Sequence, residues 1–101
     1  MAVYEWVTKL EGNSIRAALA DVLDECGFIV DEVATTEKQV SAICNPKVVA
    51  GYWSGVRLIA LWSNEDRQHA KIEVRSDEPT LRLNTHCEQR ATALMRTLPP
   101  I

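Results

Sequence analysis

The chain has 101 residues, a formal net charge of −3 at pH 7, 47% hydrophobic residues and 25% charged residues. This length fits a single domain over residues 1–101, and the composition excludes a disordered chain. The negative charge argues against a nucleic-acid-binding face, and no apolar run is long enough to cross a membrane. Because the N-terminus shows no export signal, we expect a cytoplasmic protein.

The first part of the chain predicts a strand followed by a helix. Aromatic and β-branched residues alternate with charged ones from Ala2 to Leu10, a pattern typical of a strand. From Ile15 to Cys26, apolar residues recur at spacings of three and four, which predicts an amphipathic helix. Asn13 or Ser14 can cap its N-terminus, and Gly27 stands where a left-handed residue ends a helix.

The middle of the chain predicts two further strands and an apolar connection. The strands are expected over Phe28 to Thr35 and over Gln39 to Asn45, where Pro46 ends the pairing because it lacks an N–H group. The segment Val48 to Trp53 is apolar for a loop. It can act as a lid, an edge strand or an interface, and the sequence leaves these three roles open.

The clearest hairpin runs from Gly55 to Ser76. Its second arm alternates apolar and charged residues from Ala70 to Arg75, as a half-buried antiparallel strand does. Its first arm is apolar on both faces, because Ile59 and Leu61 lie opposite the face that carries Leu58. This pattern predicts a central position in the sheet.

The last helix is predicted from His86 to Leu98. Thr85 and Glu88 match a capping box, and Pro99 prevents the helix from continuing. The order strand, helix, four strands, helix indicates an α+β domain with an antiparallel sheet and both helices on one face.

This element order resembles the β-α-β4-α pattern of the TATA-binding-protein-like fold, which the helix-grip proteins also resemble. The resemblance covers nearly the whole chain, but in element order alone. It implies a fold and carries no function. DNA binding is not implied, because the acidic balance departs from the basic binding face of that family.

Catalytic and metal-binding patterns are scarce in the sequence. Cys26, Cys44 and Cys87 are odd in number and widely spaced, which argues against a disulfide framework and a structural zinc site. Cys87 in a first helical turn is a candidate nucleophile for a thiol-dependent enzyme. His86 is badly placed as its base, because adjacent helical residues point about 100° apart. We therefore interpret Cys87 as a core residue and expect no catalytic residues, metal or cofactor.

Two binding surfaces are predicted from the hairpin and its surroundings. Ile59 and Leu61 on the outer sheet face, together with the loop aromatics Tyr52 and Trp53, favour a non-enzymatic interaction protein, either a homodimer or a partner-binding subunit. The alternative is a small anionic ligand bound by a set of three arginines near the N-terminus of the last helix: Arg57, Arg75 and Arg82.

Overall fold

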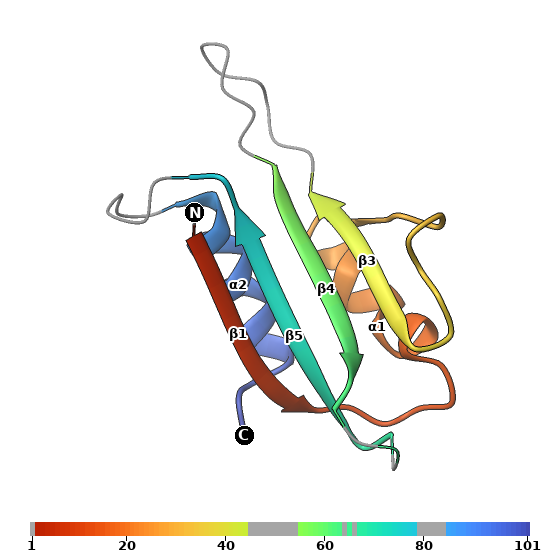
Figure 1. The fold of residues 1–101 in the computed structure, drawn as a ribbon. Coiled ribbons are helices and arrows are strands. Elements are labelled where there is room, and N and C mark those ends of the chain that lie inside the picture. The colour runs from red at the N-terminus through yellow and green to blue at the C-terminus, as the bar shows by residue number, and fades with distance from the viewer. Residues whose placement is uncertain (1, 45–54, 64, 66, 79–84) are drawn as a thin grey trace.

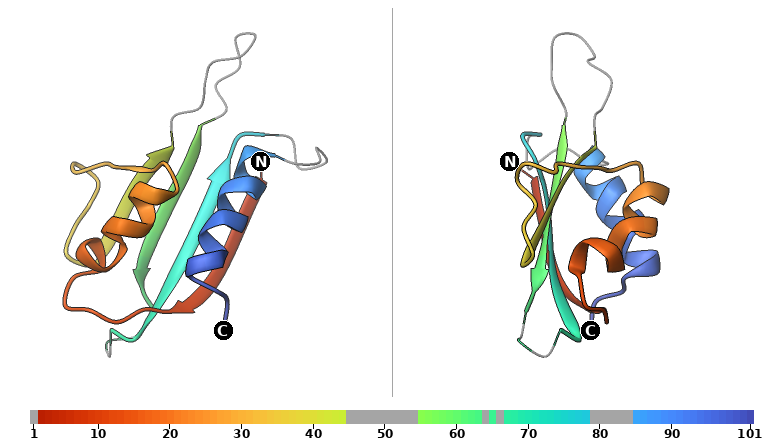
Figure 2. Two further views of the ribbon diagram at one scale, coloured as in Figure 1. Left: turned by 180° about the vertical axis from the view of Figure 1, so that it is seen from behind. Right: turned by 90° about the vertical axis from the view of Figure 1, so that its right-hand side faces the viewer.

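The structure is a computed structural model that describes residues 2–44, 55–63, 65, 67–78 and 85–101. These residues form an antiparallel sheet and two helices (Figure 1), in the predicted order. The elements are β1 (Ala2–Lys9), α1 (Ile15–Glu25), β2 (Ile29–Val30), β3 (Gln39–Cys44), β4 (Val56–Trp62), β5 (His69–Ser76) and α2 (His86–Thr97). The predicted α+β class is confirmed, and both helices lie on one face of the sheet (Figure 2).

The five described strands lie in the order β1-β5-β4-β3-β2, and every neighbouring pair is antiparallel. The strand β4 is central, as its two apolar faces predict. The outer strands of the described sheet are β1, which has eight residues, and β2, which has two.

The prediction of a strand from Phe28 to Thr35 is wrong beyond Val30. The Asp31 carboxylate accepts hydrogen bonds from the backbone N–H groups of Val33 (3.1 Å) and Ala34 (3.4 Å), which closes a turn at this point. An aspartate that binds the backbone two residues ahead competes with sheet pairing in this way. The strand β2 is therefore limited to the two residues before Asp31.

Local signals determine both ends of α1. The Ser14 hydroxyl accepts from the N–H group of Ala17 (3.4 Å), so Ser14 is the N-cap. At the other end, Gly27 has a φ of 78°, and the N–H group of Phe28 donates to the carbonyl of Leu23 (2.8 Å). This pattern is a Schellman motif, and it turns the chain into β2.

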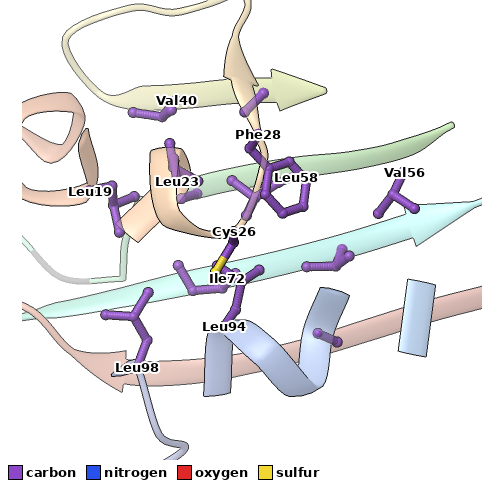
Figure 3. Packing of buried hydrophobic residues seen from close by; sticks show 14 of the residues in the cluster. Leu19, Leu23, Cys26, Phe28, Val40, Val56, Leu58, Ile72, Leu94 and Leu98 are labelled. Atoms are coloured by element: carbon purple, nitrogen blue, oxygen red, sulfur yellow. The ribbon is translucent and has the colours of Figure 1, made fainter. Parts of the chain in front are cut away.

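The core lies between the sheet and the two helices (Figure 3). Leu19 of α1, Ile72 of β5 and Leu94 of α2 are buried as predicted, whereas the predicted core residue Val22 is half-buried beside them. The predicted cap of α2 is also present, since the Thr85 hydroxyl accepts from the N–H group of Glu88 (3.0 Å).

Candidate functional site

The N-terminus of α2, near which the alternative hypothesis places an external anion, is occupied by a carboxylate of the chain itself. Glu78 is only 4% exposed and lies just after β5. It accepts hydrogen bonds from the backbone N–H groups of His86 (2.9 Å) and Cys87 (3.0 Å) and from the Ser76 hydroxyl (2.9 Å). The exposed N–H groups and positive dipole end of a helix favour a negative charge at this position.

Two opposing effects act on the pKa of Glu78. Burial raises the pKa, because a buried charge loses its hydration. The hydrogen bonds from the backbone of His86 and Cys87, from Ser76 and from the His86 ring outweigh it, so the pKa lies below its ordinary value. His86 Nδ1 lies 3.2 Å from the Glu78 carboxylate. The sequence interpretation missed this role of Glu78.

Cys87 is a core residue, in agreement with the sequence interpretation. It has no exposed surface, and its thiol donates to the backbone carbonyls of Val74 (3.4 Å) and Ala2 (3.6 Å). Burial raises the pKa of Cys87 to about 11, and the negative charge of Glu78 contributes to the increase. A thiol that stays protonated and buried is a poor nucleophile, and the neighbouring imidazole is directed to Glu78 instead.

The outer sheet face, opposite the helices, divides into an apolar part and a charged part. The register places Ile29 directly opposite Ile43, and Ile43 directly opposite Arg57. Ile59 lies opposite Ser41, diagonal to Ile43, and Leu61 follows on the same strand and face. We call the set Ile29, Ile43, Ile59 and Leu61 the outer apolar patch.

The outer apolar patch is partly open to solvent. Ile29 is 65% exposed and Leu61 is 37% exposed, whereas Ile43 and Ile59 are half-buried by their neighbours. The sequence interpretation found Ile59 and Leu61 but missed the other two residues. Ile43 could have been found from its alternation with Ala42 and Cys44, which places it on the opposite face of its strand. Tyr52 and Trp53 lie outside the described residues.

The charged part of the outer sheet face covers β5, the near end of β4 and, on β1, Glu5 between the apolar residues Val3 and Val7. The Lys71 ammonium lies 3.0 Å from the Glu5 carboxylate, and Arg75 forms an ion pair with Glu73. Arg57 lies directly opposite Arg75, so two cations are neighbours across β4 and β5. Arg82, the third predicted ligand, lies outside the described residues.

The cavities of the described chain do not single out a ligand. One of about 610 Å³ lies where the β4–β5 hairpin meets the segment before β3, and its charged lining residues are Glu37, Lys38, Glu65 and Arg67. Among the described residues of this lining, cations and carboxylates are mixed, which favours no particular charge in a ligand. A smaller cavity of about 360 Å³ lies between α1 and β2, beside the Arg16–Glu32 ion pair.

Within the described residues, no group of three or more His, Cys, Asp or Glu side chains could hold a metal ion. No described helix is long and apolar enough to span a membrane. Comparisons with protein-family models, with curated proteins and with solved structures find no match to this chain. The resemblance to the TATA-binding-protein-like fold therefore remains a prediction from element order, and the function is inferred from the surfaces described above.

Proposed function

We propose that the chain is a non-enzymatic protein-interaction domain that self-associates through the outer sheet face. The observation that supports this proposal is the outer apolar patch, which extends over β2, β3 and β4 on the face opposite the helices. Contiguous exposed apolar side chains commonly mark an interface. The charged part beside the patch resembles the polar rim of an interface, and Arg57 lies at the boundary between the two parts.

The exposed fractions indicate how much free energy the burial of the patch can contribute to association. Complete burial of an aliphatic side chain stabilises by about 1.5–3 kcal/mol, so the exposed part of Ile29 corresponds to about 1–2 kcal/mol and that of Leu61 to about 0.5–1 kcal/mol. In a two-fold dimer both copies bury the same side chains, so each of these contributions counts twice. Because association costs about 4–15 kcal/mol of lost freedom, Ile29 and Leu61 alone do not offset this cost, and the charged rim must contribute for a dimer to form at micromolar concentration.

Sedimentation equilibrium on the wild type and on Ile59→Glu with Leu61→Glu tests the proposal. We expect the wild type to associate at high micromolar concentration. The double variant should show half of the wild-type assembly mass, because association would bury its introduced carboxylates without partners. The matched control is Val33→Glu, which changes a 96% exposed apolar residue in the turn after β2. A monomeric wild type, or an assembly mass that the double variant leaves unchanged, would contradict the proposal.

The second candidate function is binding of a small anionic ligand near Arg57, Arg75 and Arg82. The pairing of Arg57 with Arg75 across β4 and β5 favours it, because two facing guanidinium groups beside the single carboxylate of Glu73 can hold a further anion between them. Thermal unfolding with sulfate and with chloride at equal ionic strength tests it. We expect sulfate to stabilise the wild type more than Arg57→Gln, and an equal response of both chains would rule it out.

A cytoplasmic location is part of the proposal. Cys26, Cys44 and Cys87 are all free and buried, as is usual where thiols remain reduced.

A further inference from the structure

The strand β1 has an edge whose backbone groups are only partly paired. Along β1, the backbone groups of alternate residues point to opposite sides. The Val7 carbonyl accepts from the N–H group of Ile101 (3.0 Å), on the side away from β5. The N–H and C=O groups of Val3 and Glu5 therefore point to the same open side as those of Val7.

The C-terminal residues already occupy one end of this edge. Thr8 and Pro100 form an antiparallel bridge, and the Thr8 hydroxyl donates to the carbonyl of Pro99 (2.8 Å). Within the described residues, the edge from Ala2 to Trp6 has no such partner. Proteins commonly protect an edge by keeping it short or by placing proline there. The opposite edge strand β2 has two residues, whereas β1 has eight and contains no proline.

We propose that this free edge pairs with β1 of a second copy, antiparallel and about a two-fold axis at Tyr4, so that the two sheets become continuous. In this register Val3 of one copy exchanges two backbone hydrogen bonds with Glu5 of the other, and the symmetric pair does the same. The paired segment is residues 2–6, the described part of β1 whose open edge has no backbone partner among residues 99–101.

The register with its two-fold axis at Glu5 is disfavoured for two reasons. An axis at Glu5 would place two Glu5 carboxylates directly opposite each other, and like charges in this position destabilise a sheet. It would also require Val7 to pair with Val3 of the other copy, although Ile101 already binds the Val7 carbonyl. An extended segment of an unrelated protein would satisfy the same backbone groups, but a second copy also pairs the two half-buried Tyr4 side chains across the axis.

The side chains on the helix face support the same axis. Tyr4 and Met95 are both partly buried apolar residues packed against the core. Burial raises the pKa of Tyr4, and the negative charge of the Glu88 carboxylate contributes to the increase. About the proposed axis, Tyr4 lies opposite Tyr4 of the second copy in a non-hydrogen-bonded pair, where side chains approach most closely and aromatic pairs are favourable.

The helices of the two copies also fit. Arg90 on one flank of α2 donates to the carbonyl of Cys26 at the end of α1 (2.9 Å), so the opposite flank, with Glu88, Thr92 and Met95, faces the β1 edge. The helix α2 packs against β1 and β5 (Figure 2). The α2 helix of the second copy would therefore lie beside this flank, on the same face of the continuous sheet.

This contact uses a different surface from the outer sheet face, and it does not rest on the proposed function. If both contacts form, the assembly is a tetramer with two kinds of two-fold interface. The edge is therefore tested in the Ile59→Glu, Leu61→Glu background, where the outer sheet face is blocked. In that background we expect sedimentation equilibrium to show a dimer at high micromolar concentration.

The decisive variant in that background is Glu5→Pro, which removes an outward N–H group and leaves the bonds of β1 to β5 intact. We expect Glu5→Pro to convert the dimer to monomer, and the matched control Glu5→Thr, which keeps the N–H group, to leave it dimeric. The inference would be overturned if the Ile59→Glu, Leu61→Glu variant were monomeric, or if its dimer persisted after Glu5→Pro.

A cross-link provides a second measurement in case Glu5→Pro fails to fold. In the proposed register the two Tyr4 Cα atoms lie about 4.5 Å apart, within the range of about 4.4–6.8 Å that a disulfide spans. In the same background, Tyr4→Cys should form a disulfide-linked dimer on mild oxidation, and Val33→Cys should not. Equal cross-linking of the two variants, or none with Tyr4→Cys, would also overturn the inference.

Discussion

Replacement of Glu78 by glutamine should destabilise the fold although it changes no side-chain shape. One carboxylate oxygen of Glu78 accepts from the N–H group of Cys87 and the Ser76 hydroxyl, and the other accepts from the N–H group of His86. Whichever oxygen becomes an amide nitrogen, one backbone N–H group then faces a donor instead of an acceptor. The helix also loses the negative charge at its N-terminus.

The magnitude follows from these two losses. A buried donor without an acceptor costs about 1–3 kcal/mol, and the loss of a carboxylate at a helix N-terminus costs about 0.3–1 kcal/mol. We therefore expect Glu78→Gln to lower the free energy of unfolding by about 1–4 kcal/mol at neutral pH. The matched control is Glu37→Gln, an exposed residue, which should change the free energy of unfolding by less than about 0.5 kcal/mol.

The pH dependence tests the electrostatic part of this reasoning. Because the pKa of Glu78 in the folded state lies below the ordinary value of 4.5, its ionised form stabilises the fold in full above pH 4.5. This stabilisation is lost as the pH falls through the folded pKa, because protonated Glu78 resembles glutamine. Urea unfolding in pH steps should therefore show a difference between wild type and variant that is constant near neutral pH and narrows in acid.

Two results would refute this account of Glu78. A variant as stable as the wild type at neutral pH would mean that the carboxylate does not hold the start of α2. A large difference that persists unchanged into acid would assign the effect to packing rather than to charge.

Two further predictions concern the core. Leu94→Ala should lower the free energy of unfolding by about 2–5 kcal/mol, because it leaves a cavity beside the sheet at a fully buried position, and an unchanged urea midpoint would remove Leu94 from the core. Cys87 should react slowly with a thiol reagent in the native state and rapidly after unfolding, and rapid native labelling at neutral pH would restore the thiol-enzyme hypothesis.

Much of the fold could be predicted because its signals are local. Ser14, Gly27 and Thr85 act on the backbone within a few residues, and all three have the predicted roles. The period of two in the hairpin similarly indicated which faces of β4 and β5 are buried. The length of β2 was missed because the competing Asp31 turn is a weaker local signal than a run of apolar residues.

The candidate surfaces depend on strand pairings that cannot be read from the sequence. Ile29 and Ile59 are distant in the chain, and only the register of β2, β3 and β4 brings them to one patch. The role of Glu78 was missed, because nothing near it in the chain shows that α2 begins at its carboxylate.

The sequence by itself therefore determined the type and order of the elements, the ends of α1, the start of α2 and the buried state of Cys87, because each depends on periodicity or on contacts within one turn. Only the tertiary structure decided that Glu78 fills the anion position at α2, that Arg57 faces Arg75, and that β1 is an edge already closed at one end by residues 99–101. These features join segments far apart in the chain, and their geometry arises from how the sheet and helices pack together.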